Sequence, residues 1–397
     1  MLPTTDRCVG KLKSAILPSQ PPARYAARLC VELPGVLYLD PEGSIHRLTR
    51  ARYGPLPMDK PEQKDIEDWS GAWRPPRYEV DGNDKIIGYV NDRTPNNWGR
   101  WGELDELGTI NFLTPERVRT ALALPRTGDV ISCAIPISEI MPVHPSRPAV
   151  VHTHALTGTD IVSGLVADRA NGGFFGSDDY LFFPLQSATH WDGLTHAYQD
   201  ATMYNGFWVG AVGAAGGARR CSIHLLAGRL TGRGVLLDVA RHQEVTRLLP
   251  GHAITADQLE LCAEAEHVDL RAGDILLVRT GELRWFFDLE DKTPYWSGAH
   301  PGLSIDTVDW IHSREFAAIA IDNRTFEVTP FEHTGGVTYP LHARLICDLG
   351  LTIGELWWLE DLASACARAG RWEFLLSAPP LPVAGASGAP TTPIAYL

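Results

Sequence analysis

The residues best suited to chemistry lie in one segment, Gln186 to His196, which reads Gln-Ser-Ala-Thr-His-Trp-Asp-Gly-Leu-Thr-His. In an extended conformation, side chains of period two would place Gln186, His190, Asp192 and His196 on one face. The residues before this segment are mostly apolar. A buried row of polar groups needs partners, because an unpaired buried carboxylate costs several kcal/mol. A divalent metal ion would supply the missing charge.

These side-chain types indicate a particular metal chemistry. Imidazole and carboxylate ligands suit zinc or manganese, and an ion open to water would lower the pKa of that water toward neutrality. His196, farther along the same face, would then act as the proton-transferring base. The alternative is a hydrogen-bonded core histidine at His190 and a loop residue at His196. We favour the metal site because three such residues fall in phase.

A second cluster of polar residues lies between Tyr339 and Glu355. His342 follows Pro340 at a predicted helix start, where an imidazole can point out of the N-terminus toward a site. Glu355 follows Gly354 and is predicted to open the next helix. As a first-turn acid, it would be favoured there by the helix dipole even without a ligand role.

The elements that must position these groups alternate between helix and strand. Thr114, Thr255 and Ser304 are predicted helix N-caps, and glycine–aspartate pairs precede two of the strands. The predicted helices are 115–124, 256–266, 305–312 and 355–369, and the predicted strands are 130–137, 275–278, 317–321 and 372–377. Repeated helix-then-buried-strand units predict an α/β fold.

Composition restricts the classes of function. The 35 Lys and Arg against 48 Asp and Glu give a net charge of −13, which argues against nucleic-acid binding. No stretch reaches the roughly 18 apolar residues of a membrane span, and no secretory signal is evident, so we expect a cytoplasmic protein. The seven cysteines form no Cys-x-x-Cys pair and are expected to be buried apolar residues.

The first 85 residues differ from the rest. Eleven of the 29 prolines fall in the first 80 residues, which is a poor composition for packed elements. We therefore predict a proline-rich extension over 1–85, with one hairpin around Pro41-Glu42-Gly43, and a single catalytic domain over 86–397.

The segment Gln186 to His196 resembles the metal-dependent cyclase family, which includes bacterial kynurenine formamidase and isatin hydrolase. The family hallmark reads His-x-Gly-Thr-His-x-Asp-x-Pro-x-His. Its second His, its Asp and its last His match His190, Asp192 and His196, whereas the first His is Gln186 here. Further stretches resemble the longer family members in the same order: Asn97–Asn111, Asp178–Tyr180, Met203–Gly206, His300–Leu303, Asp322–Asn323 and Gly388–Ile394.

The resemblance implies a swivelling β/β/α fold, assembled as a homo-oligomer (a dimer or a tetramer), with a site for one or two metal ions. It implies that His190 and Asp192 bind the first ion and that Asp192 bridges to a second ion held by His342 and Glu355. His196 would be the catalytic acid/base.

Gln186 is the main departure from the family hallmark. It would take the place of a metal-binding His, and an amide oxygen is a weaker zinc ligand than imidazole. The first ion site is therefore expected to be weak, manganese-preferring or empty.

The implied reaction is hydrolysis of an amide, formamide, lactam or lactone carbonyl of a small molecule, with a metal-bound hydroxide as nucleophile and His196 moving the proton. Two alternatives remain: a secondary-metabolite cyclase or isomerase that uses the same pocket without net hydrolysis, and a binding protein that has lost catalysis.

Candidates for the substrate pocket come from other residues. An aromatic wall would be formed by Trp191, Tyr204, Phe207 and Trp208, although core packing accounts for them equally well. His154 shares a predicted strand face with His152, and we expect a pocket or core role for it. Arg279 would meet a substrate carboxylate or form an ion pair.

Overall fold

The computed structural model of the chain describes residues 37–39, 45–47, 79–166, 174–332 and 337–397. Contacts divide the chain into two units, Met1–Pro76 and Arg77–Leu397. In the first unit, β1 (Leu37–Leu39) pairs antiparallel with β2 (Ile45–Arg47). Most of the predicted proline-rich extension, including the predicted Pro-Glu-Gly turn, lies outside the described residues.

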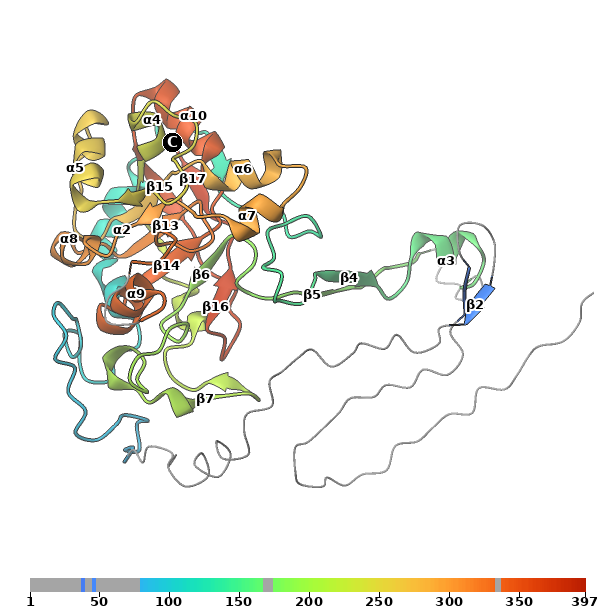
Figure 1. Cartoon of the computed structure of the whole chain (residues 1–397), viewed down its shortest axis with the longest axis horizontal. Helices are drawn as coiled ribbons and strands as arrows, with labels where there is room; N and C mark the ends of the chain where they lie inside the picture. The colour runs from blue at the N-terminus through green and yellow to red at the C-terminus, as the bar shows by residue number, and fades with distance from the viewer. Residues whose placement is uncertain (1–36, 40–44, 48–78, 167–173, 333–336) are drawn as a thin grey trace, which may run out of the picture. The chain divides into compact units, whose positions relative to one another are not determined.

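A nine-stranded mixed sheet organises the second unit (Figure 1), with the order β16-β6-β14-β13-β11-β9-β15-β17-β3. The four central strands β14, β13, β11 and β9 are parallel, and the strands on either side of them run antiparallel. The strands are β3 (Val130–Ser132), β6 (His190–Asp192), β9 (Thr231–Leu237), β11 (Ile275–Val278), β13 (Ala318–Ile321), β14 (Thr352–Glu355), β15 (Glu373–Ser377), β16 (Gly388–Pro390) and β17 (Ile394–Tyr396).

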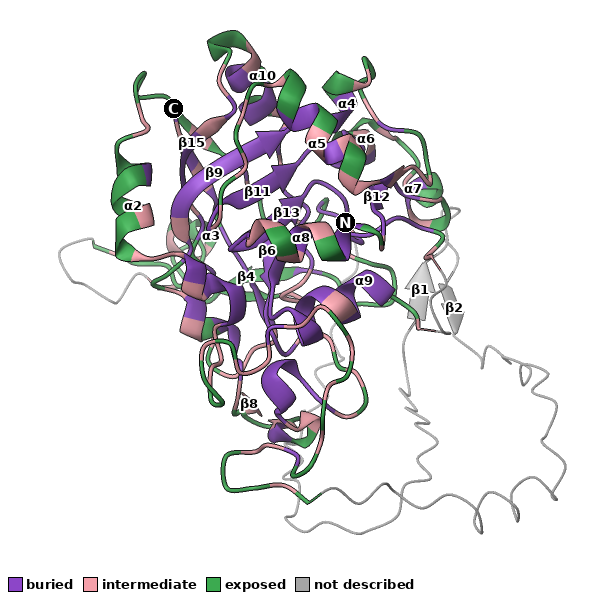
Figure 2. Cartoon of the chain, turned by 90° about the vertical axis from the view of Figure 1, so that its left-hand side faces the viewer, coloured by how far each residue is buried: buried purple, intermediate pink, exposed green. Residues whose placement is uncertain are grey.

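Helices cover both faces of this sheet, so the central strands are buried except at Thr231, the first residue of β9 (Figure 2). Leu276 of β11 packs in one cluster with residues of α5 and α8, whereas Leu277 packs in another with residues of α10. A strand buried on both faces reads as a continuous apolar run, as Ile275–Val278 does. The α-helices are α2 (Pro115–Leu122), α3 (Gly158–Val162), α4 (Val239–His242), α5 (Ala256–Ala265), α6 (Glu282–Asp288), α7 (Thr293–Ser297), α8 (Thr307–Arg314), α9 (Pro340–His342) and α10 (Glu360–Ala369).

The remaining helical segments and strand pairs are short. The 3₁₀ segments are Gly108–Phe112, Tyr204–Gly206, Val209–Ala211 and Ile223–Leu226, and a π-helix, Ala343–Asp348, follows α9. Three further strand pairs lie outside the large sheet: β4 (Val151–His154) with β5 (Asp179–Phe182), β7 (Val212–Gly213) with β8 (Gly217–Ala218), and β10 (Ala253–Ile254) with β12 (Gly302–Leu303).

Several local predictions are confirmed. β11 covers the predicted 275–278, and α5 begins after Thr255, whose side chain and that of Gln258 form a reciprocal capping box. Thr114 caps α2 by accepting a hydrogen bond from the amide of Arg117. The five described cysteines are buried free thiols. Within the described ranges, no helix is long and apolar enough to cross a membrane.

Other predictions are wrong. Glu355 does not open a helix: it is the last residue of β14, and α10 begins five residues later at Glu360. The strand predicted over 130–137 ends at Ser132. The predicted extended segment 186–196 shrinks to the three residues of β6. The two strands are shorter than predicted because turns end them without a strong local signal, whereas Glu355 pairs with His190 of β6 in the sheet and does not begin a helix.

Strand pairing places the predicted chemical residues side by side. In the antiparallel pair β6–β14, His190 lies opposite Glu355 and Asp192 lies opposite Ile353. On the other side of β6, Gly388 of β16 lies opposite Asp192. Residues directly opposite each other on paired strands project to the same face. His190, Asp192 and Glu355 therefore share one face at this end of the sheet.

Candidate metal centre

His190 is oriented so that one ring nitrogen is free to bind a ligand. Its side chain is fully buried, and its Nδ1 lies 2.7 Å from the carbonyl oxygen of Ala188. Since a carbonyl only accepts hydrogen bonds, Nδ1 carries the proton and Nε2 carries the lone pair. Nε2 lies 3.6 Å from Asp192 Oδ1 and 3.6 Å from Glu355 Oε2, and it has no hydrogen-bond partner among the described residues.

Asp192 is a buried carboxylate without hydrogen bonds. It is 1% exposed, and neither of its oxygens has a hydrogen-bond partner in the described part of the chain. Such a group is costly unless another positive charge reaches it. A Cβ at Gly388 would lie 2.7 Å from Gln186 Nε2 and 3.3 Å from Asp192 Oδ1. The glycine thus leaves this side of the carboxylate open and brings Gln186 beside the cluster.

His342 is held in the same way as His190. Its Nδ1 lies 2.6 Å from Glu327 Oε1, which also accepts the backbone N–H of His342 at 3.0 Å. Nε2 is then directed at Glu355, 3.4 Å from Oε1. A carboxylate behind a metal-binding histidine fixes its tautomer and raises its basicity. Sequence reasoning missed Glu327, whose only local signal is an acidic residue between the apolar Phe326 and Val328.

His196 lies at the edge of the cluster. It follows a turn closed by its N–H on the carbonyl of Gly193, at 2.9 Å. Its Nδ1 is 3.4 Å from Asp192 Oδ1, and its side chain is 28% exposed, whereas that of His190 is fully buried. The position suits a group that exchanges protons with a substrate, and it also suits a ligand.

The spacing of these groups matches a metal site better than a hydrogen-bonded network. Distances of 3.4 to 3.6 Å between the ring nitrogens and carboxylate oxygens are long for hydrogen bonds. Two atoms bound to one tetrahedral zinc at about 2.0–2.1 Å each lie about 3.3 Å apart. Within this cluster, two triplets have ligand atoms within 4.8 Å of one another, and both contain Asp192: His190, Asp192 and Glu355; Asp192, His196 and His342. The residues therefore fit one ion, or two ions bridged by Asp192.

The electrostatics of the cluster also favour a cation. Burial by itself would raise the pKa of Asp192, but the charges of His196 and His190 outweigh it, and the pKa is lowered. Burial would lower the pKa of His342, but its interactions with Glu327 and Glu355 raise that pKa to about 10. The carboxylates thus draw protons onto histidines, and a metal ion would compete for the same positions.

His196 behaves differently from the other two histidines. Burial lowers the pKa of His196 more strongly than the charge of Asp192 raises it, so the net shift is downward from 6.5. For His190, burial also lowers the pKa, but the charges of Asp192 and Glu355 and the hydrogen bond to Ala188 together outweigh it, and the pKa is raised. His196 is therefore the histidine of this cluster best suited to remain neutral near pH 7.

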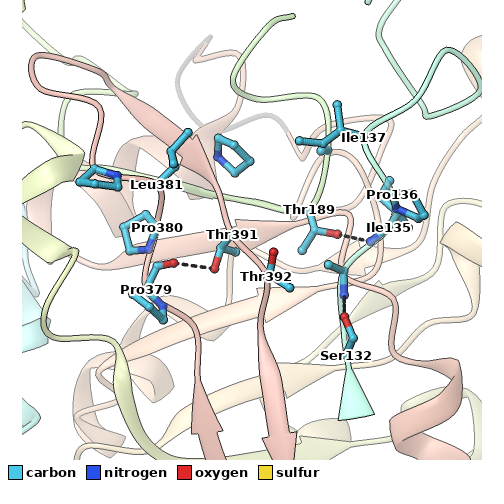
Figure 3. Close-up of a pocket in the computed structure, with 14 residues that line it drawn as sticks. Ser132, Ile135, Pro136, Ile137, Thr189, Pro379, Pro380, Leu381, Thr391 and Thr392 are labelled. Atoms are coloured by element: carbon cyan, nitrogen blue, oxygen red, sulfur yellow. Dashed lines mark hydrogen bonds between the residues drawn. The ribbon is translucent and has the colours of Figure 1, made fainter. Parts of the chain in front are cut away.

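A cavity of about 280 Å³ opens beside the cluster. Its polar lining includes His196, His342 and Glu355 from the cluster and two cations, Arg147 and Arg324. A larger cavity of about 710 Å³ lies elsewhere (Figure 3), bordered by Pro379–Pro382, Thr391 and Thr189, whose hydroxyl accepts a hydrogen bond from the amide of Ile135. None of the described residues lining it is ionisable, so the smaller cavity is the candidate for catalysis.

The predicted aromatic wall is not on this cavity. Trp191, Tyr204 and Phe207 are fully buried in the core, and the partly exposed Trp208 does not line the cavity either. Trp191 stacks edge-on against Trp357, with ring centroids 4.7 Å apart, and the Tyr204 hydroxyl donates a hydrogen bond to Asp105. These large apolar side chains pack in the core and do not line the cavity, because burial is more favourable for them than exposure.

The predicted pocket residue His154 is likewise outside the cavity lining. It is exposed on β4, where it lies opposite Asp179 and forms a separate triplet with Asp179 and His152. The Nε2 of His152 lies 2.6 Å from Asp179 Oδ2. Arg279 forms ion pairs with Asp238 and Glu360 and does not line this cavity.

Comparison with known proteins places the chain in a family. The family described as "Putative cyclase" matches residues 131–328. A crystal structure described as a novel cyclase is 40% identical, with a TM-score of 0.72, over 76% of this chain and 99% of that one. No curated protein gives a significant match.

More distant structures include isatin hydrolase A from Ralstonia solanacearum (16% identity, 67% of this chain and 91% of that one, TM-score 0.49). Another is a predicted metal-dependent hydrolase from Bacillus stearothermophilus (20% identity, 67% and 97%, TM-score 0.43). Similarity at this level says nothing about the reaction. The 40% identity over nearly the whole length of the novel cyclase does decide the family: this chain belongs to the cyclase family that matches residues 131–328.

Proposed function

We propose that this protein is a metal-dependent hydrolase that adds water to an amide, formamide, lactam or lactone carbonyl of a small molecule. One observation carries the proposal. His190 and His342 each have Nδ1 tied to an acceptor, Ala188 and Glu327 respectively, and their Nε2 atoms converge on Glu355 beside a cavity. Imidazoles oriented in this way are ready to bind zinc or manganese.

His190, Asp192, His342 and Glu355 would hold the ion. When bound, a divalent cation polarises a carbonyl oxygen and lowers the pKa of a water molecule. His196 accepts the proton of the attacking water at Nε2, the ring nitrogen that Asp192 does not approach, and Asp192 stabilises the resulting imidazolium. The proton then passes to the leaving nitrogen or oxygen as the C–N or C–O bond breaks, so that one water is added overall.

Metal dependence is the direct test. Purified full-length protein is expected to contain stoichiometric zinc or manganese, to lose activity on a panel of formamides, lactams and lactones after chelation, and to regain it when the ion is returned. The double variant His152→Ala/His154→Ala removes the exposed triplet and is the matched control, because it should leave activity unchanged. Full activity in metal-free protein would contradict the proposal.

A second candidate is a cyclase or isomerase that uses the same cavity without net hydrolysis. Its support is the description of both the family and the 40%-identical structure as cyclases. The mass of the product separates the two candidates, since hydrolysis adds the elements of water and isomerisation adds nothing.

A further inference from the structure

Three side chains form a hydrogen-bonded chain from the core to the cavity beside the metal cluster. Glu282 and His300 are fully buried, and Glu282 Oε1 lies 2.6 Å from His300 Nδ1. On the other side of the ring, Arg324 Nε donates to His300 Nε2 at 3.0 Å. Arg324 is half-buried and lines the cavity. None of these three side chains is used by the proposed reaction.

The hydrogen-bonding capacity of the groups determines the state of each one. A guanidinium has donors only, so His300 Nε2 must accept and His300 Nδ1 must carry the proton that Glu282 accepts. The second oxygen of Glu282 accepts from Arg247 Nε at 2.6 Å. Both oxygens of the buried glutamate are thus used, and the imidazole is held in one tautomer and one orientation. The Nε edge of Arg324 is therefore anchored to a rigid support.

The remaining N–H groups of Arg324 have no partner among the described residues. Its bond to His300 is the one hydrogen bond that the described residues make with it, and none of their carboxylates lies within ion-pair distance of it. The guanidinium carbon lies 5.4 Å from the ring centre of Trp296, which shields one side of the cation. Arg279, by contrast, donates four hydrogen bonds, to Asp238, Glu360 and the Thr246 carbonyl. Arg324 is thus held in place but not neutralised.

The lining of the cavity therefore combines two kinds of group. His342 and Glu355 belong to the metal cluster, whereas Arg324 and Arg147 are cations. If Arg324 only balanced the acidic cluster, it would pair with a cluster carboxylate, as Arg233 pairs with Asp274 at 2.6 Å. It makes no such pair among the described residues.

We propose that Arg324 binds a carboxylate of the substrate, separate from the carbonyl that reacts, and that His300 and Glu282 are positioning residues for it. The substrate class would then be an amide, lactam or lactone that carries a carboxylate. A guanidinium with its two terminal nitrogens free is the side chain that binds a carboxylate through two parallel hydrogen bonds. The choice of substrate class rests on the proposed function, but binding of the carboxylate does not require turnover.

Equilibrium binding tests the proposal without a known substrate. Benzoate and its neutral counterpart benzamide are titrated into the full-length protein, both metal-loaded and chelated, because benzoate could also bind the ion directly. In the chelated protein we expect benzoate to bind about 10- to 100-fold more tightly than benzamide, the range for a charge-assisted pair. Arg324→Gln should abolish this preference and leave the metal content unchanged. Equal binding of the two probes, or a preference that survives Arg324→Gln, would overturn the proposal.

Two variants at His300 test the positioning role. His300→Gln keeps an acceptor for Arg324 and a donor for Glu282, and it should retain most of the preference for benzoate. His300→Leu removes both and should lose the preference as Arg324→Gln does. An unchanged preference in His300→Leu would remove His300 from the proposal.

Catalysis provides an independent readout once the panel yields a substrate. Arg324→Gln should raise KM for a carboxylate substrate about 10- to 100-fold and raise KM for the matching carboxamide much less. A loss of kcat on both substrates would contradict the carboxylate role. Failure of the proposed hydrolysis would appear instead as inactivity of the unmodified protein, with the benzoate preference intact.

Discussion

In His190 and His342, the nitrogen that does not face the cluster is already hydrogen-bonded, to a backbone carbonyl in one case and to Glu327 in the other. This arrangement directs both Nε2 atoms into the cluster, where Asp192 has no hydrogen-bond partner among the described residues. None of the described residues forms such a hydrogen bond with the ring of His196, which is the most exposed of the three rings. At the scale of single residues, two histidines are therefore suited to ligation and one to proton transfer.

His196→Ala is expected to lower kcat/KM by about 10²- to 10⁴-fold, the usual contribution of a positioned acid/base. Metal content, measured by elemental analysis, should remain that of the unmodified protein because four other ligands are present. If metal is lost together with activity, His196 is a ligand and the acid/base must be sought elsewhere on the cavity.

Gln186→His is expected to tighten zinc binding at least about 10-fold, because imidazole is a better zinc ligand than an amide oxygen. The measurement is competition with a chelator of known affinity. Ser387→Ala is the matched control: it removes the hydroxyl to which Gln186 Nε2 donates at 3.2 Å without adding a ligand, and should leave the affinity unchanged. Equal affinity in Gln186→His and the unmodified protein would place residue 186 outside the metal shell.

At the scale of elements, the site depends on two short strands in register. β14 places Glu355 opposite His190. Gly354, the preceding residue, allows β14 to pack closely against its neighbours. A Cβ on Gly354 would lie 2.6 Å from Trp357 Nε1 and 2.7 Å from the Cβ of Ala320. No larger residue fits at this position without displacing the strand that carries a ligand.

The residue that follows the α5 helix, Glu266, is expected to make the free energy of unfolding depend on pH. Glu266, just after α5, accepts the amide of Asp238 at 3.1 Å. Burial, reinforced by the charge of Asp238, raises the pKa of Glu266 from 4.5 to about 8. The folded protein thus binds a proton that the unfolded chain has released between pH 4.5 and 8, so this group lowers the free energy of unfolding as pH rises through that window.

Glu266→Gln keeps the shape and removes the charge. Relative to the unmodified protein, the variant should gain a few kcal/mol in free energy of unfolding between pH 5 and pH 9, measured by urea denaturation at both values. Glu264→Gln changes an exposed glutamate of the same helix and is the matched control. A difference between Glu266→Gln and the unmodified protein that is the same at both pH values would contradict the pKa assignment.

At the scale of the whole molecule, the large sheet accounts for the core but leaves one hairpin uncovered. All residues of β4 and β5 are exposed, and they include Val151, Tyr180, Leu181 and Phe182, which are 46% to 63% exposed. Apolar side chains gathered in this way are typical of an interaction surface. We expect this surface to be buried in the homo-oligomer that the family resemblance implies.

Light scattering of the full-length protein is therefore expected to give a dimer or a tetramer. Leu181→Asp/Phe182→Asp should shift the mass toward the monomer, because a buried unpaired charge is unfavourable in an interface. Leu249→Asp changes a leucine that is 75% exposed elsewhere and should leave the mass unchanged. If the unmodified protein has the mass of a monomer, β4 and β5 do not form an assembly surface.

The sequence alone determined what local chemistry controls. Threonine caps and apolar runs predicted α5 and β11, because capping hydrogen bonds and burial act within a few residues. The alternation of His190 and Asp192 predicted their common face, since period two is a property of the strand itself. These local features, together with the family resemblance, were sufficient to predict the α/β class and the centre of the site.

Only the tertiary structure decided which distant residues complete that centre. Glu327 stands behind His342, and Arg324 rests on His300 and Glu282, through contacts that no local period encodes. The same holds for Trp191 and Tyr204, whose burial depends on what packs over them. Local patterns specify the faces of an element, whereas the neighbours that meet each face follow from the pairing and packing of segments far apart in the chain.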